Sequence, residues 1–242
     1  MTGQSPLSTG GTSGKGRTTD VGLNQPQLDP LDKKVLCSAI CYCESTPNIG
    51  KDGQELKQSC VAQRLTELDK VYMEFQGRSP WKPEISYDMT KAPPSPILDS
   101  ESKSGAHGWI PGWIKKYWDT DPEHPPFKAG KGMIRRPDVV ILIDPKKPPT
   151  QDNIKQVVEM KFPPDTPRTE QLNDYAKIAG DENKVVTLRP PDCDCGQEKQ
   201  DSKVPVEELG MATTIVTAIL WLLSRGKGPR PILTPARPVP VY

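Results

Sequence analysis

The clearest apolar patterns lie in the second half of the chain and predict two neighbouring strands. Residues 139–143 are an unbroken run of branched apolar residues, which is typical of a strand buried on both faces. Residues 155–162 are also strand-like, and side chains along a strand point alternately to opposite faces. Glu159 and Lys161 therefore fall on one face and their apolar neighbours on the other. If the two strands pair, Asp138 lies beside Glu159 and Lys161.

Apolar residues that recur at three- and four-residue steps predict helices. A helix is expected over about 54–75, and a shorter helix or cysteine-rich packed segment over about 31–45. A further helix over about 167–179 is expected to begin with Thr166 as its N-cap and to end at Gly180.

Two more segments complete the predicted core. Residues 84–88 and 184–188 have the composition of short strands. The elements then follow the order helix, strand, strand, strand, helix, strand. This order predicts a fold of the α/β (α+β) class.

Composition divides the chain into a leader, one domain and a tail. Residues 1–29 are rich in Gly, Ser, Thr and Gln and are expected to form a flexible leader. Residues 30–228 are expected to form a single domain, followed by an extended, proline-rich tail over 229–242. The uncharged stretch 211–223 is shorter than the roughly 20 residues that span a bilayer. We therefore favour a buried helix that packs on the sheet over a membrane segment there.

An insertion over about 79–130 carries an unusual number of tryptophan and proline residues. Trp109, Trp113 and Trp118 are expected to share one face of a short helix. One use of such a face is core packing. The other is a platform for an unpaired base or a wedge against a duplex end, because stacking on an aromatic ring does not require a particular base.

Charge is almost balanced over the whole chain, with 32 Lys and Arg against 31 Asp and Glu and a net charge of +1. A nucleic-acid enzyme of this composition needs a local basic patch, because the protein as a whole has no strong positive field. Such a run leads directly into Asp138 and consists of Lys128, Lys131, Arg135 and Arg136. We expect these residues to hold a phosphate backbone.

The cysteines leave two interpretations open. They are Cys37, Cys41, Cys43, Cys60, Cys193 and Cys195. Reduced thiols in the cytosol are favoured, since the first twenty residues lack the apolar core of a secretory signal peptide. The alternative is a zinc cluster that joins the two groups of cysteines, although their spacing differs from that of common zinc sites.

Asp138, Glu159 and Lys161 together indicate a metal-dependent hydrolase. Two nearby carboxylates repel each other, and a divalent cation that takes an oxygen from each removes this conflict. Mg²⁺ suits such a site because it prefers oxygen ligands and accepts a phosphate oxygen as a further ligand. A lysine beside the second carboxylate can orient the attacking water or stabilise charge on a phosphate.

These residues also resemble a known family. Pro137-Asp138 followed by Glu159-Met160-Lys161 resembles the PD-(D/E)XK motif of restriction-endonuclease-like nucleases. The double arginine Arg135-Arg136 before it, with Gln171 and Tyr175 after it, is similar to the VRR-Nuc domain in particular. Residues 130–190 carry this likeness.

The resemblance implies a restriction-endonuclease-like core, in which a central mixed sheet is flanked by helices. It also implies that Asp138, Glu159 and the backbone carbonyl of Met160 bind Mg²⁺ or Mn²⁺, that Lys161 positions water, and that Gln171 supports the site. The preceding helix often adds an acidic ligand in this superfamily, and Glu55 is preferred to Glu67 for that role. Tyr175 is expected to pack.

The resemblance implies a metal-dependent DNA endonuclease that acts on structured DNA. The cysteine-rich start and residues 87–91 and 108–113 resemble bacterial VRR-Nuc toxins of type VI secretion. Such a toxin is cytoplasmic in its producer, enters the target-cell cytoplasm, and is neutralised by a cognate immunity protein. Alternatives are a repair or phage nuclease, a non-catalytic DNA-structure-binding module, and a membrane-perturbing toxin.

Overall fold

A mixed sheet of four strands, ordered β3-β7-β8-β9, is the centre of the described structure. The computed structural model describes residues 26–74, 77–100 and 105–195. The strands are β3 (Trp81–Pro83), β7 (Val139–Leu142), β8 (Ile154–Met160) and β9 (Val185–Leu188). β7 pairs antiparallel with both β3 and β8, whereas β8 and β9 are parallel. The predicted α+β class and the mixed sheet are confirmed.

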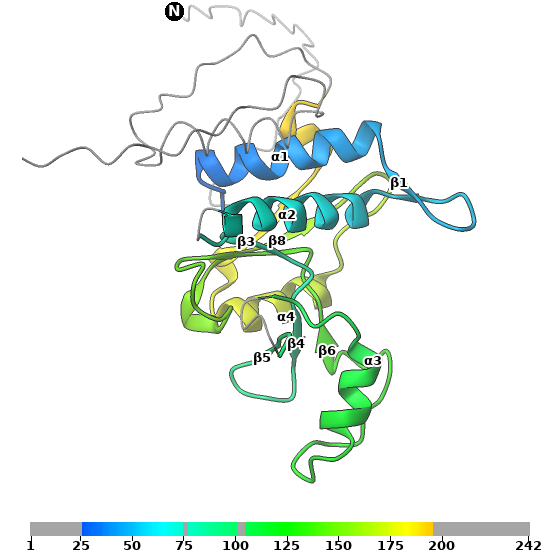
Figure 1. Cartoon of the computed structure of the whole chain (residues 1–242), viewed down its shortest axis with the longest axis vertical. Helices are drawn as coiled ribbons and strands as arrows, with labels where there is room; N and C mark the ends of the chain where they lie inside the picture. Colours follow the sequence, from blue (N-terminus) through cyan, green and yellow to red (C-terminus); the bar gives the residue numbers. More distant parts are fainter. Residues whose placement is uncertain (1–25, 75–76, 101–104, 196–242) are drawn as a thin grey trace, which may run out of the picture.

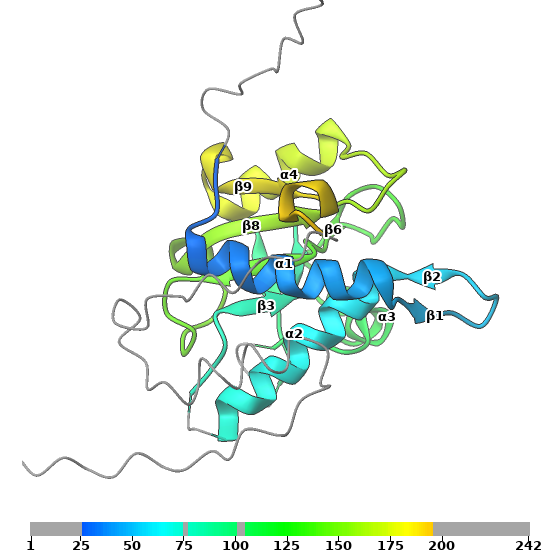
Figure 2. The same ribbon diagram turned by 90° about the horizontal axis from the view of Figure 1, so that it is seen from above.

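Helices cover both faces of this sheet (Figure 1). The helices α1 (Pro30–Ser45) and α2 (Lys57–Glu74) lie on one face, and α4 (Thr169–Ala179) lies on the other. Seen from above, α1 crosses α2 at an angle (Figure 2). The three predicted helices therefore exist, with boundaries that differ by a few residues.

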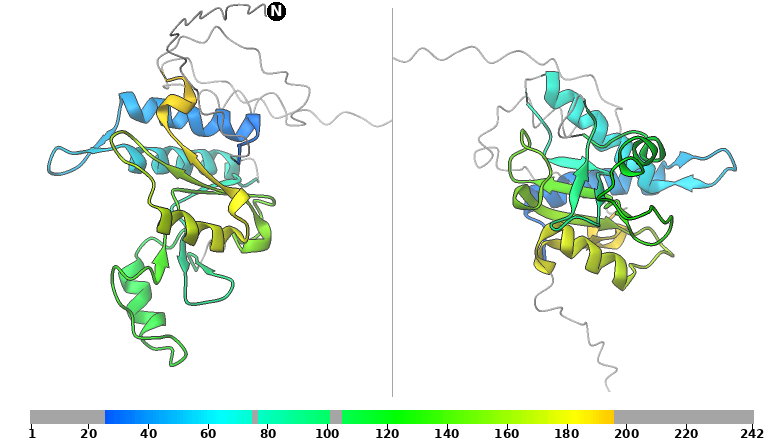
Figure 3. Two further views of the ribbon diagram at one scale, coloured as in Figure 1. Left: turned by 180° about the vertical axis from the view of Figure 1, so that it is seen from behind. Right: turned by 90° about the horizontal axis from the view of Figure 1, so that it is seen from below.

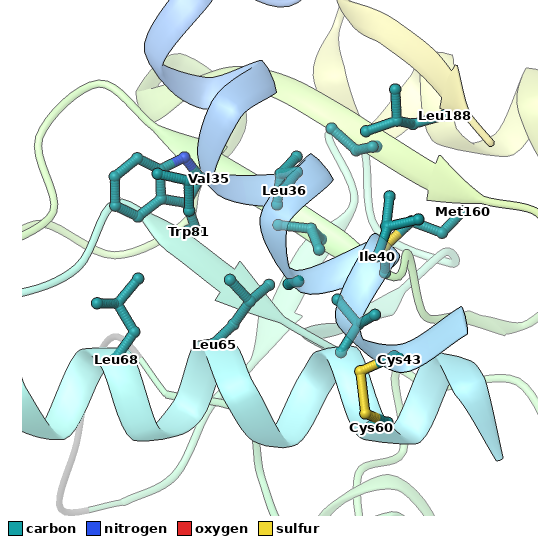
Figure 4. Packing of buried hydrophobic residues seen from close by; sticks show 14 of the residues in the cluster. Val35, Leu36, Ile40, Cys43, Cys60, Leu65, Leu68, Trp81, Met160 and Leu188 are labelled. Atoms are coloured by element: carbon teal, nitrogen blue, oxygen red, sulfur yellow. A yellow bond between two sulfur atoms is a disulfide. The ribbon is translucent and has the colours of Figure 1, made fainter. Parts of the chain in front are cut away.

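The alternation predicted for β8 decides which residues enter each layer of the core. Val158 and Met160 pack with α1 and α2, whereas Val157 packs with α4. Figure 4 shows the first layer, in which Ile40 of α1 lies next to Met160 and Leu65 of α2 points toward α1. All five side chains are at most 1% exposed. Burying one such side chain contributes roughly 1.5–3 kcal/mol.

Three disulfides join parts of this layer, and they correct the prediction of reduced thiols or a zinc cluster. The bridges are Cys37–Cys193, Cys41–Cys195 and Cys43–Cys60, and the described residues contain no free cysteine. Cys37 and Cys41 are one helical turn apart in α1, so both face the segment after β9, which begins with η4 (Pro190–Cys193). This pairing depends on how α1 packs, which cysteine spacing alone does not reveal.

The first core strand was predicted in the wrong place. Residues 84–88 were expected to form it, but β3 ends at Pro83, and Glu84 then adopts a positive φ of 53° that turns the chain. β3 is an edge strand, where a proline is tolerated because no ladder donor is lost. The predicted segment instead contributes β4 (Ser86–Asp88) to a second, antiparallel sheet with β5 (Ser95–Ile97) and β6 (Ile134–Arg135).

Two predicted helix starts also shift. α4 begins after Arg168 rather than Thr166, without a side-chain cap, although Gly180 ends it in the left-handed region as expected. Before α2, β1 (Asn48–Ile49) pairs with β2 (Glu55–Leu56), so residues expected in the first turn of the helix are extended instead. Short 3-10 helices precede β8 and β9, namely η2 (Gln151–Asn153) and η3 (Glu182–Lys184).

The insertion forms an arm that projects from the sheet layers (Figure 3). We call residues 105–133 the arm. Its helix is α3 (Ile110–Trp113), which continues as the π-helical turn η1 (Ile114–Trp118). Trp118 is buried and Trp109 is exposed, so the predicted shared use of the tryptophans is wrong.

Other predictions fall on residues that the structure does not describe. These are most of the leader, the buried helix expected over 211–223, and the tail over 229–242. Among the described residues, none of the helices has the length and apolar character needed to cross a bilayer.

Candidate functional site

The pairing of β7 with β8 brings the two predicted carboxylates together. Val139 lies opposite Val158, so Asp138, one residue before, lies beside Glu159, one residue after. The backbone N–H of Met160 donates a 2.6 Å hydrogen bond to Asp138 Oδ2, which holds this carboxyl against the end of β8. Asp138 and Glu159 therefore share one end of the sheet, on the side that faces α4.

Asp138 has a strongly perturbed acidity. Burial raises the pKa of its carboxyl to about 7, and the neighbouring charge of Glu159 adds to this effect. The Met160 N–H and the Lys161 ammonium oppose the shift without cancelling it. Without a cation, these two acids therefore cannot both ionise easily at neutral pH.

Glu159 and Lys161 form a buried pair that is incompletely satisfied. The Glu159 side chain is 1% exposed, and its Oε1 atom contacts Nζ of Lys161, which is 11% exposed. Glu159 Oε2 is also buried and has no hydrogen-bond partner among the described residues. A buried carboxylate oxygen without a partner is costly. Its position beside a second carboxylate suits a divalent cation, so the residues present fit the metal that the motif implies.

Gln58 enters the site from the first turn of α2 and is not among the residues predicted from the sequence. Its Nε2 atom donates a 2.8 Å hydrogen bond to the Met160 carbonyl oxygen and lies 3.4 Å from Asp138 Oδ2. Those two oxygens are the proposed metal ligands. The resemblance predicts an acidic ligand from this helix, and a glutamine in its first turn does not match that expectation.

The two acidic candidates near α2 lie elsewhere. Glu55 belongs to β2, its side chain is 57% exposed, and it forms an ion pair with Lys57 at 3.3 Å. Glu67 accepts a hydrogen bond from Gln63 on the exposed side of α2. In the part of the chain that the structure describes, no three His, Cys, Asp or Glu side chains gather as a metal-binding group.

Gln171 reaches the site through Tyr175, one turn later in α4. Its Nε2 atom donates a 2.8 Å hydrogen bond to the Tyr175 hydroxyl, which in turn donates to the Arg136 carbonyl oxygen at 3.1 Å. Burial raises the pKa of Tyr175, and the nearby charge of Glu159 raises it further. Tyr175 is therefore more than packing, since its hydroxyl connects α4 to the segment that carries Asp138.

A family comparison agrees with this arrangement. Residues 113–189 match the model of the VRR-NUC domain. The chain contains a VRR-NUC domain. The match includes Asp138, Glu159, Lys161 and Gln171, whereas α1, α2 and β3 precede it. No curated protein and no solved structure matches the chain.

The VRR-NUC domain implies nuclease activity, and nucleases of this domain typically use divalent metals. DNA is a plausible substrate for such a domain. The match does not extend to a toxin role, a delivery route or an immunity protein, which stay predictions from the sequence.

The four basic residues before Asp138 divide into two groups. Arg135 Nε is 2.6 Å from Asp174 Oδ2, so this side chain links β6 to α4. Lys128 and Lys131 are exposed, and the Arg136 side chain is 57% exposed with only a long contact of 3.8 Å to Glu84. Three of the four therefore remain available to phosphates.

A cleft of about 400 Å³ lies at the VRR-NUC site between the start of α2 and the segment after β8. Gln58 forms part of its wall, so the cleft reaches the residue that contacts Asp138. Its other lining residues are Glu55, Leu56, Lys57, Ser59, Glu84, Arg136, Phe162, Pro163, Pro164 and Asp165. Gln58 therefore connects the cleft to the carboxylate pair.

Proposed function

We propose that this protein is a divalent-metal-dependent DNA endonuclease whose active site is built on Asp138 and Glu159. The observation that carries this proposal is the adjacent pair of a half-buried carboxyl, Asp138, with a raised pKa, and a buried carboxyl, Glu159, with an oxygen that lacks a partner among the described residues. A cation held between them satisfies both groups. The match to the VRR-NUC domain supports the same reaction class.

Each residue has a role that follows from its position. Asp138, Glu159 and the Met160 carbonyl would hold Mg²⁺ or Mn²⁺. When bound, the cation supplies Lewis-acid stabilisation of the phosphate and of the attacking oxygen. Lys161, already against Glu159, would position the attacking water, and Gln171 would keep Tyr175 in place.

Gln58 would supply a further oxygen to the metal. The nitrogen and oxygen of a glutamine amide are assigned from the surrounding hydrogen bonds, and the amide can turn over. In the structure its nitrogen faces Asp138 Oδ2 and the Met160 carbonyl. With a cation on those oxygens, the opposite orientation presents Oε1 to the same point.

The decisive experiment compares the wild-type protein with Asp138→Ala, Glu159→Ala and Lys161→Ala on supercoiled plasmid and on branched DNA with Mg²⁺. We expect the wild type to cut, and each variant to lose at least about 100-fold in rate, in line with the loss of a positioned charged group. Glu182→Ala, which removes an exposed acid in η3, is the matched control and should cut normally. Equal cutting by all variants would overturn the proposal.

The proposed biological setting is that of an antibacterial toxin with a cognate immunity protein. Disulfides form and persist in oxidising environments, and three of them support a protein that spends part of its life outside a reducing cytosol. Controlled expression in bacteria tests the idea. We expect wild-type protein to kill and Asp138→Ala to be harmless, whereas harmless wild-type expression would favour a repair or phage nuclease.

A further inference from the structure

One large apolar side chain on the arm is unusually exposed. Trp109 is 69% exposed, the highest value among the large apolar residues of the described structure. A single exposed apolar residue needs no explanation in general. Trp109 differs because one face of its ring lies against Gly112 of α3.

The Trp109 ring lies against the backbone of α3 at Gly112, where no side chain blocks it. A Cβ atom at position 112 would lie 2.1 Å from one ring carbon of Trp109 and 2.4 Å from another. Only glycine therefore allows the indole to lie over the helix backbone, with its opposite face turned to solvent. With one face against position 112, the ring presents its other face to solvent, and we call this exposed ring the platform.

The base of the arm is anchored to the second sheet. Trp118 is buried, donates a 2.8 Å hydrogen bond from Nε1 to the Pro125 carbonyl, and packs on His124 with 4.5 Å between ring centroids. His124 Nε2 in turn lies 2.8 Å from Asp88 Oδ2 of β4. The platform is thus fixed to the body of the protein by its buried tryptophan.

The surroundings of the platform suit a nucleic acid. Lys115 and Lys116 are exposed on the turn that follows α3, and Lys116 Nζ lies 4.9 Å from the centre of the Tyr117 ring. The arm then leads through β6 directly to Asp138. Figures 1 and 2 place α3 on the same side of the molecule as the start of α2, where Gln58 lines the cleft.

We propose that Trp109 stacks on an unpaired base of single-stranded or branched DNA, while Lys115 and Lys116 contact the adjoining phosphates. This inference rests on the proposed DNA endonuclease function. It adds a preference of the enzyme for unpaired DNA, which the arm would supply. Base stacking on an aromatic ring works with any base, so the preference is for structure rather than sequence.

Binding without metal tests the inference separately from cleavage. Fluorescent single-stranded, forked and blunt duplex DNA are titrated with the full chain in EDTA. We expect Trp109→Ala to weaken binding of the forked and single-stranded DNA roughly 5- to 100-fold, the range for loss of one base stack, and to leave blunt duplex binding nearly unchanged. Trp109→Phe should retain most of the affinity.

Two further variants distinguish an oriented platform from a general apolar contact. Gly112→Ala keeps the tryptophan but displaces its ring, so its affinity for forked DNA should fall toward that of Trp109→Ala. Ile143→Ala removes a side chain of similar exposure, 64%, at the far end of β7 and should have no effect. Replacement of Lys115 and Lys116 by Ala should reduce the salt dependence of binding by about one to two ions.

The outcomes separate the two proposals. If wild-type protein cuts DNA but Trp109→Ala binds forked DNA as tightly as wild type in EDTA, the stacking inference is wrong and the nuclease proposal stands. If the catalytic variants cut normally while Trp109→Ala loses binding, the proposed active site is wrong and the stacking inference stands. If Trp109→Ala instead alters only self-association or the protease resistance of residues 196–242, the platform is covered by protein and not by DNA.

Discussion

Asp138 illustrates how a single half-buried group links acidity, stability and metal binding. Its carboxyl has a pKa of about 7, raised mainly by burial. A proton and a divalent cation therefore compete for the same oxygen atoms near neutral pH. Metal affinity should rise with pH up to about that value, because each bound cation displaces the proton.

The same shift predicts the pH dependence of stability without metal. A carboxyl with a raised pKa holds its proton in the native state over the window from about pH 4 to pH 7, where the unfolded chain has lost it. The free energy of unfolding then falls as pH rises across that window, by at most about 1.4 kcal/mol per pH unit for one proton. Urea unfolding in EDTA should show this slope in wild type and a flatter one in Asp138→Asn. An equal slope in both proteins would contradict the assignment.

Gln58 allows a second prediction at the scale of one residue. Gln58→Glu adds a negative charge beside two would-be ligands, so the protein should bind Mn²⁺ more tightly, whereas Gln58→Ala should bind it about tenfold more weakly. Titration calorimetry measures both changes independently of cleavage. Gln63→Ala, on the exposed side of the same helix, is the matched control and should bind Mn²⁺ as wild type does. Unchanged affinity in both Gln58 variants would remove Gln58 from the site.

At the scale of elements, alternation along β8 was the most informative feature of the sequence. It correctly placed Glu159 opposite its apolar neighbours, and the register with β7 then followed from pairing two apolar strands. β3 was missed because a three-residue strand that ends in proline has almost no periodic pattern. Gln58 and the disulfide partners were missed because they depend on where α1 and α2 pack, which is a property of the tertiary structure.

The end of α4 gives a prediction at this scale. Gly180 has a φ of +75°, and a Cβ there would lie 2.8 Å from the Gln151 side chain. Gly180→Ala should therefore lower the free energy of unfolding by about 1–2 kcal/mol, the usual cost of a left-handed alanine. At Gly108 a Cβ atom would have no neighbour within 4 Å, and the φ angle lies outside the left-handed region. Gly108→Ala should therefore change the free energy of unfolding by less than about 0.5 kcal/mol. Denaturant unfolding of both variants makes the comparison.

At the scale of the whole molecule, two disulfides close almost the same loop. Cys37–Cys193 and Cys41–Cys195 span 156 and 154 residues, and both join α1 to the segment that follows β9. Once one of them has formed, the second restricts the unfolded chain only slightly more. The two bridges are therefore largely redundant in their effect on the unfolded state.

This redundancy predicts non-additive losses. Replacement of both cysteines of either bridge by serine should cost clearly less than the typical 2–5 kcal/mol, whereas removal of both bridges should cost more than the sum of the two single losses. Loss of the short Cys43–Cys60 bridge should instead be nearly additive with either, since its loop of 17 residues is nested in the long loops and changes their length only slightly. Thermal or denaturant unfolding of the variants that lack one bridge or two measures these differences, and additive losses for the two long bridges would contradict them.

The long bridges also determine how the molecule behaves when its backbone is cut. A protease that cleaves once between Cys60 and Cys193 produces two pieces. Cys37 and Cys41 of α1 then lie on the first piece, and their partners Cys193 and Cys195 lie on the second. The pieces remain covalently joined, so a nicked sample migrates as an intact chain on a gel until a reductant is added.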